Sequence, residues 1–369
     1  MNAMPRNPAD FDARHRGARS FVPGRFEKEA REAFDDGWTP AEREATRLKT
    51  TVTEERSRSI LSHNDSPDVG FSTSINPYRG CEHGCIYCYA RPSHAYLELS
   101  PGLDFESKLF AKTNAPELLR AALARPGYVA SPIALGANTD CYQPVERRYR
   151  ITRQILEVLS ECEHPVTLVT KSALVERDLD LLAPMAARNL VKVFVSIGTL
   201  DRELAAKLEP RAATPARRLA ILGSLAAAGV PCGVMIAALI PALNDRTMEQ
   251  VLEAAAAAGA REAAYVIMRL PHELKDLFKE WLAAHYPERA EHVVSIVRQL
   301  RGGRDNDPRF GTRMTGVGNY AELIEKRFDI ACRRFGLNGH GAGRKPAELD
   351  CTRFKPPARR DDAKQLGLF

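Results

Sequence analysis

Three cysteines stand close together in the sequence, at positions 81, 85 and 88. They form a C-x3-C-x2-C motif inside the run from Asn76 to Tyr89, in which glycines stand next to two of the cysteines. Three thiolates in so short a loop can bind one face of a cubic 4Fe-4S cluster, whereas a fully ligated cluster needs four. The motif therefore predicts a cluster held by Cys81, Cys85 and Cys88 with one iron left open for a ligand.

A zinc ion held by the three cysteines and His83 or His94 is the competing interpretation. Zinc ribbons and fingers pair their ligands as C-x2-C with a distant second pair, and the motif does not follow that pattern. A second cluster would need three or four ligands; among the remaining cysteines only Cys332 and Cys351, with His340 between them, are near each other, and they have no C-x2-C element. The spacing therefore favours one iron–sulfur cluster over a zinc site or a second cluster.

Eight cysteines in 369 residues are too few for a disulfide scaffold, so we expect reduced thiols and a cytoplasmic protein. The N-terminal residues have scattered charges and no apolar segment of the kind that a secretory signal requires. The uncharged run from Ile221 to Asn244 is long enough to span a bilayer. Because Gly229-Val230-Pro231 places a turn in its middle, we interpret it as a helix end before a buried strand, and we expect no membrane span.

Short β-branched runs alternate with stretches of helical periodicity through the middle of the chain, which predicts an α/β fold with a parallel sheet. Six units of this kind fit a partial (β/α)6 TIM-like barrel with N- and C-terminal extensions. The expected strands are residues 71–78, 132–137, 166–170, 191–197, 232–239 and 263–268. The expected helices are residues 115–123, 152–159, 214–228 and 247–258.

Composition divides the chain into a polar N-terminal extension (1–65), a core (66–300) and a basic C-terminal extension (301–369). The last segment holds 15 lysines and arginines against 9 acidic residues, which accounts for the whole net charge of +6. A basic extension on a neutral body predicts contact with a polyanion such as nucleic acid. A solvated basic tail without a partner is the alternative.

Polar residues stand where the expected strands end, which is where parallel α/β barrels gather their chemistry. Thr139 follows the second expected strand, Lys171 follows the third, and Ser196 lies at the end of the fourth. Arg269 follows the sixth and could reach a substrate or cofactor. We expect these side chains to meet the cysteine motif at one edge of the sheet.

The cysteine motif, with Tyr87 as the aromatic residue before the last cysteine, resembles the motif of the radical S-adenosylmethionine (SAM) superfamily. Within that superfamily the chain is similar to the spore photoproduct lyase-like branch and its uncharacterised bacterial relatives, from about residue 76 to residue 270. The similar elements are Cys88-Tyr89, Thr139-Asp140, Thr170-Lys171, Ser196-Ile197, Leu208-Glu209-Pro210 and Ala228-Gly229-Val230-Pro231.

The resemblance implies a 4Fe-4S cluster whose open iron binds SAM. One electron, from a flavodoxin- or ferredoxin-type donor, then splits SAM into methionine and a 5′-deoxyadenosyl radical that takes a hydrogen atom from the substrate. By the same analogy Thr139, Lys171 and Ser196 contact SAM, while Tyr87 and Tyr89 line the cluster. The cofactors supply the difficult chemistry, and the protein positions and shields them.

One position departs from the lyase pattern. The lyase carries a hydrogen-donating cysteine just before the residue that corresponds to Thr139, where this chain has Gly136-Ala137-Asn138. The nearest thiol here is Cys141, on the other side of Asp140, and it is our candidate for a catalytic cysteine. The departure puts the lyase's own reaction in doubt for this chain.

The last five residues, Gln365 to Phe369, resemble the Q-L-x-L-F peptide by which bacterial repair and replication proteins dock on the sliding clamp. Together with the basic extension, this favours a radical SAM enzyme that acts on nucleic acid in DNA repair or modification. Modification of a protein or small molecule is the first alternative. A non-catalytic iron–sulfur or zinc module that recruits partners through its tail is the second.

Overall fold

The computed structural model describes residues 11–12, 15–27, 46–340 and 348–357. Its centre is a seven-stranded sheet in which six parallel strands follow one another in chain order and a seventh, β4, pairs antiparallel with the first of them. The strands are β4 (Leu61–His63), β5 (Thr73–Ile75), β8 (Ile133–Leu135), β9 (Val166–Thr170), β10 (Val191–Ser196), β11 (Cys232–Leu239) and β12 (Glu262–Ile267). The predicted α/β fold is thus confirmed, and each of the six expected strands is present.

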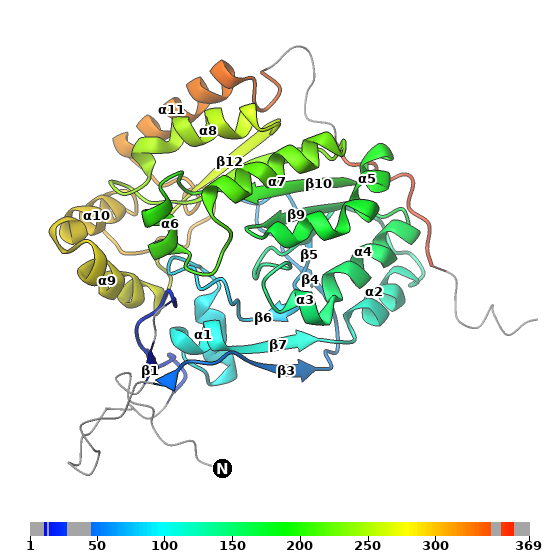
Figure 1. Cartoon of the computed structure of the whole chain (residues 1–369), viewed down its shortest axis with the longest axis horizontal. Coiled ribbons are helices and arrows are strands. Elements are labelled where there is room, and N and C mark those ends of the chain that lie inside the picture. The colour runs from blue at the N-terminus through cyan, green and yellow to red at the C-terminus, as the bar shows by residue number, and fades with distance from the viewer. Residues whose placement is uncertain (1–10, 13–14, 28–45, 341–347, 358–369) are drawn as a thin grey trace, which may run out of the picture.

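Helices between the strands cover the outside of this sheet (Figure 1). They are α2 (Ala115–Leu123), α3 (Glu146–Tyr149), α4 (Ile151–Glu161), α5 (Leu179–Ala187), α6 (Arg202–Leu208), α7 (Pro215–Ala227) and α8 (Met248–Ala257). The sheet curls as a partial barrel: β12 and β4 are its two edges, and no strand in the described part of the chain joins them.

The uncharged run 221–244 comprises the end of α7 and the strand β11, as expected from the turn at its centre. Thr214 caps the first turn of α7 by accepting a hydrogen bond from the Arg217 amide at 3.4 Å, and a proline follows at the first helical position. Among the described residues, no helix is both long enough and apolar enough to cross a bilayer.

A second, three-stranded sheet lies beside the first and carries the start of the cysteine loop. Strand β5 is shorter than expected because the chain turns at Asn76-Pro77 and re-enters as β6 (Tyr78–Arg79). Strand β6 pairs with β7 (Lys108–Lys112), which in turn pairs with β3 (Thr51–Glu55). A further two-residue pair joins β1 (Phe11–Asp12) to β2 (Thr46–Arg47).

A buried ion pair between Arg91 and Glu106 fastens three segments together. Arg91 follows the cysteine loop in the short helix η2 (Arg91–Leu97), and Glu106 lies in α1 (Leu103–Ser107). Neither side chain is exposed. The Glu106 carboxylate also accepts hydrogen bonds from the amides of Gly17 and Ala18, at 2.9 and 2.7 Å. Part of the predicted N-terminal extension is therefore packed against the cysteine loop.

The C-terminal third adds helices to the edge of the sheet formed by β12. These are α9 (Leu274–His285), α10 (Pro287–Gln299) and α11 (Asn319–Phe335). Helix α11 packs on α8, where Arg327 forms an ion pair with Glu249 at 2.7 Å (Figure 1).

Residues 348–357 run along the other end of the molecule (Figure 1). Asp350 donates its amide to the Asn189 carbonyl, just before β10, and Lys355 donates its amide to the Cys162 carbonyl, just before β9, both at 2.9 Å. The Phe354 ring packs against the His164 ring, with centroids 5.3 Å apart. This segment is therefore held at the N-terminal ends of the parallel strands, opposite the edge where the predicted site residues stand.

The substitution Glu106→Gln tests the importance of the buried pair. It leaves the Arg91 guanidinium buried without a carboxylate, which should lower the free energy of unfolding by about 3–5 kcal/mol. The exposed pair between Arg120 and Glu161 provides the matched control, since Glu161→Gln should cost about 1 kcal/mol or less. Urea unfolding of both variants, at the same iron content, measures the difference, and equal losses would contradict the role of Glu106.

Candidate active site

The three cysteines of the motif lie in a turn-rich loop that follows β6. None is in a disulfide; Cys81 and Cys85 are buried and Cys88 is partly exposed. Burial raises the pKa of Cys81 well above its usual value, and the neighbouring Asp140 carboxylate and the other two thiols raise it further. Burial likewise raises the pKa of Cys85, to about 12. Thiols grouped in this way become thiolates only beside a positive group, so they suit an iron–sulfur cluster.

Each of the two histidines of the zinc alternative has one ring nitrogen close to an oxygen atom, while the Nδ1 atom of His94 has no hydrogen-bond partner among the described residues. The Nδ1 atom of His83 lies 3.2 Å from the Asp140 carboxylate, and Nε2 of His94 lies 3.0 Å from the Lys108 carbonyl oxygen. Within the part of the chain that the structure describes, no group of three or more His, Cys, Asp or Glu side chains is arranged around a single metal ion. A 4Fe-4S cluster does not require its thiolates to surround a single metal ion, because each thiolate binds a different iron atom.

Hydrogen bonds from the Arg91 side chain to backbone carbonyls hold the cysteine loop in place. Arg91 donates from Nε to the Cys85 carbonyl at 2.9 Å and from Nη2 to the Gly84 carbonyl at 3.0 Å. Both glycines of the loop have positive φ, +74° at Gly80 and +67° at Gly84. A Cβ at Gly84 would lie 2.5 Å from the Glu106 carboxylate, so a side chain there would disturb the buried pair.

A buried triad of Tyr87, Glu209 and Arg218 connects the loop to the sheet. The Tyr87 hydroxyl donates to one oxygen of Glu209, and the Arg218 guanidinium donates to the other. Arg218 also donates to the carbonyl of Ser196, at the end of β10, at 2.8 Å. Burial alone would raise the pKa of Glu209, but the charges of Arg218 and Lys171 lower it, so the carboxylate stays ionised.

Lys171, which follows β9, brings a positive charge to the cysteine loop. Its ammonium lies 5.8 Å from the centre of the Tyr87 ring. Burial favours its neutral form, but Cys85 and Glu209 raise the pKa of Lys171 above its usual value, so it stays charged. The predicted meeting of Lys171 with the loop is therefore present in the structure.

Asp140 fixes the backbone around Lys171. Its carboxylate accepts hydrogen bonds from the Thr170 hydroxyl at 2.8 Å and from the Lys171 amide at 2.7 Å. Burial would raise the pKa of Asp140, but His83 and the amides of Lys171 and Tyr142 hold it at about 2. Asp140 thus joins the ends of β8 and β9 to the cysteine loop.

The hydroxyls of Thr139 and Ser196 lie at strand ends, as expected, but both donate to backbone carbonyls. Thr139 donates to Tyr78 at 2.8 Å, and Ser196 donates to Ala237 at 3.3 Å. Each is buried. Their hydroxyls can still accept a hydrogen bond, so contact with SAM stays a prediction for both.

Tyr89 and Arg269 lie together at the outer border of the loop. Tyr89 is 48% exposed and its hydroxyl donates to the Ala137 carbonyl. The Arg269 guanidinium lies 6.0 Å from the centre of the Tyr89 ring. Arg269 therefore reaches the site from the end of β12, as the sequence suggested it could.

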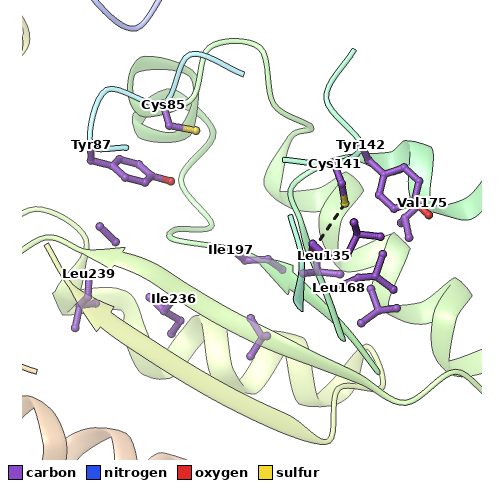
Figure 2. Close-up of a cluster of buried hydrophobic side chains, with 14 of the residues drawn as sticks. Cys85, Tyr87, Leu135, Cys141, Tyr142, Leu168, Val175, Ile197, Ile236 and Leu239 are labelled. Atoms are coloured by element: carbon purple, nitrogen blue, oxygen red, sulfur yellow. Dashed lines mark hydrogen bonds between the residues drawn. The ribbon is translucent and has the colours of Figure 1, made fainter. Parts of the chain in front are cut away.

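Cys141 does not join this group. It is fully buried among Leu135, Tyr142, Leu168 and Val175, on the other side of the core from Cys85 (Figure 2). Burial raises the pKa of its thiol well above the usual value. A catalytic role for Cys141 stays a prediction that its position does not support.

Other predicted features lie away from the site or outside the described residues. Cys332 is buried in α11, whereas Cys351 belongs to the segment at the opposite ends of the strands. The peptide Gln365 to Phe369 is outside the described residues, so docking on a sliding clamp stays a prediction from the sequence.

Sequence reasoning missed Arg91, Glu106 and Arg218. Glu209 was noted only as part of the resemblance, without a role. No spacing rule pairs Arg91 with Glu106 or Glu209 with Arg218, and only the folded chain brings them together. Buried arginines are rare without a partner, but exposure cannot be read from an isolated arginine in a sequence.

The model of the Radical SAM superfamily matches residues 75–255. An uncharacterised protein of Mycobacterium tuberculosis is 40% identical over 272 residues, which cover 73% of this chain and 76% of that protein. An uncharacterised protein of Methanocaldococcus jannaschii is 27% identical over 220 residues, 59% of this chain and 78% of that one.

Solved structures of spore photoproduct lyase share the fold. The lyase complexed with dinucleoside spore photoproduct has a TM-score of 0.57 at 16% identity, over 78% of this chain and 80% of the lyase. A double mutant with bound AdoMet and the same dinucleoside has a TM-score of 0.53 at 17% identity, with the same coverage. The chain belongs to the radical SAM superfamily, whose enzymes use a 4Fe-4S cluster and S-adenosylmethionine.

Proposed function

We propose that Cys81, Cys85 and Cys88 bind the 4Fe-4S cluster and that the enzyme acts on nucleic acid. The observation that carries the first part is the group of three buried or half-buried thiols in one loop, beside the ammonium of Lys171. A cluster held by these three residues would supply the electron for the reductive cleavage of SAM. A flavodoxin- or ferredoxin-type protein is the proposed electron donor.

The chain's own residues bind and orient SAM in this proposal. Lys171 offers a half-buried cation for the SAM carboxylate, and the triad of Tyr87, Glu209 and Arg218 fixes the wall beside it. Because the Glu209 carboxylate lies close to both Lys171 and Arg218, these side chains keep their positions before SAM binds. Tyr89 and Arg269 are left at the border, where a larger substrate can approach.

A nucleic-acid substrate is supported by charge and by structural likeness. The region from residue 301 onward holds the whole positive excess of the chain. The lyase that shares the fold has been solved in complex with a dinucleoside spore photoproduct. Cys141 is buried in the core, so its position does not support a hydrogen-donating role like that of the lyase cysteine. The proposed reaction on the nucleic acid is therefore a repair or modification step that differs from the lyase's own.

Replacement of a cluster ligand tests the first part of the proposal. Wild-type protein purified without oxygen should hold about four irons and, when reduced with SAM, should release 5′-deoxyadenosine. Cys85→Ala should lose most of the iron and the product. Cys232→Ala is the matched control, because Cys232 is a buried thiol in β11. Iron and product that survive Cys85→Ala at control levels would refute this assignment.

Lys171→Met tests the proposed SAM contact. Loss of a charge-assisted hydrogen bond of about 1.5–3 kcal/mol should weaken SAM binding about 10- to 100-fold while iron content is retained. Lys326→Met, on the exposed face of α11, removes the same charge at a distance and should leave the dissociation constant unchanged. Equilibrium binding of SAM measures both, and equal constants would argue against a role for Lys171.

A further inference from the structure

The loop that follows α10 concentrates positive charge next to the site. Residues 301–313, called the arginine loop below, contain four arginines, two aspartates and an exposed phenylalanine, Phe310. Arg301 is buried and donates from Nη2 to the carbonyls of Ile267 and Met268, at 3.0 and 2.8 Å. The loop therefore begins at the C-terminal end of β12, the strand that delivers Arg269.

The arginine loop also reaches the opposite edge of the sheet. Arg313 forms an ion pair with Asp68, in the connection between β4 and β5, and the Gly311 amide donates to the same carboxylate at 2.6 Å. Because β12 and β4 are the two edge strands, the loop crosses the opening of the partial barrel. It is fixed at both ends, so its middle is presented in a defined place.

Two of its arginines, Arg304 and Arg309, present exposed guanidinium groups, and Arg309 is also paired with Asp307. Arg301 and Arg313 are committed to the contacts above, but Arg304 is exposed and makes no ion pair within the described residues. Arg309 has a side chain 69% exposed, and Asp307 holds it from the inner side at 2.9 Å. Three of these arginines and Asp307 line a hollow of about 470 Å³, which leaves an excess of positive charge there.

The arginine loop is connected to the cysteine loop through Arg269. Its guanidinium packs on Tyr89, the neighbour of Cys88, and its Nη1 atom lies 3.8 Å from the Met314 sulfur, just past the arginine loop. Burial, with the nearby charge of Arg313, lowers the pKa of Arg269. A ligand in the hollow would thus border the substrate side of the site.

We propose that the arginine loop binds the sugar–phosphate backbone of a single nucleic-acid strand, with Arg304 and Arg309 on phosphates and Phe310 stacked on a base. Planar guanidinium groups bind phosphate oxygens in pairs. Two exposed rings, Phe310 at 55% and Tyr89 at 48%, lie near the guanidinium groups of Arg313 and Arg269 respectively, and surfaces that bind single strands likewise combine aromatic rings with basic side chains. An acidic protein could pair with the arginines but would have no bases to stack on the exposed rings. The inference rests on the nucleic-acid substrate proposed above and names where that substrate is held.

Salt-dependent binding tests the arginines. Iron-loaded protein is titrated into a fluorescein-labelled single-stranded DNA at several salt concentrations, and anisotropy gives the binding constant. In a plot of log binding constant against log salt, Arg304→Gln should reduce the slope by about 0.7, and the double variant Arg304→Gln/Arg309→Gln by about twice that. The control Arg333→Gln/Arg334→Gln removes two exposed charges from α11 and should keep the wild-type slope.

Phe310→Leu tests the ring. It should weaken binding about tenfold with an unchanged salt slope, because base stacking carries no counterion release. Arg304→Gln breaks no ion pair among the described residues, so a changed slope in this variant does not come from unfolding, which thermal denaturation checks.

The outcomes separate this inference from the proposed function. Slopes equal to those of the α11 control would overturn the role of the arginine loop, while release of 5′-deoxyadenosine by the same preparation would leave the enzyme assignment standing. Polyglutamate that competes as well as the DNA would overturn it in favour of an acidic protein partner. Absence of DNA binding by the wild type would overturn both the loop's role and the nucleic-acid substrate.

Discussion

The ion pair between Arg91 and Glu106 is the contact on which the shape of the cysteine loop depends. Arg91 has its donors directed at Glu106 and at four backbone carbonyls, two of them inside the loop and two at Pro101 and Gly102. A guanidinium with no exposed surface is stable only when its donors are satisfied, so the loop, α1 and the N-terminal segment must hold one arrangement. That arrangement fixes the backbone that carries Cys85.

Charge on the sheet side complements this anchor. Lys171 and Arg218 share the Glu209 carboxylate, while Asp140 fixes the backbone that carries Lys171. Arg218 is paired with Glu209 within the protein, and the nearby Cys85 and Glu209 keep Lys171 charged despite its burial. The site is therefore preorganised: its polar groups need little rearrangement when a charged ligand enters.

The strands and the cysteine motif were predictable because both depend on short-range patterns. Val191–Ser196 and Cys232–Leu239 are nearly continuous apolar runs, which identify buried parallel strands. The buried pairs depend on long-range packing instead: Arg218, in α7, meets Glu209 only in the folded chain. Cys141 shows the same limit, since its position after a strand end predicted a site residue but the turn at Asp140 directs it into the core. Short strands such as β3 lie in polar sequence that has no clear periodicity.

Residues 348–357 are anchored at one end of the sheet. Their contacts with Glu163 and Asn189 place Pro357 near the N-terminal ends of the parallel strands, opposite the candidate active site. Pro357 therefore lies at the ends of the strands opposite the arginine loop, which follows the C-terminal end of β12 and is where we propose that a nucleic-acid strand binds.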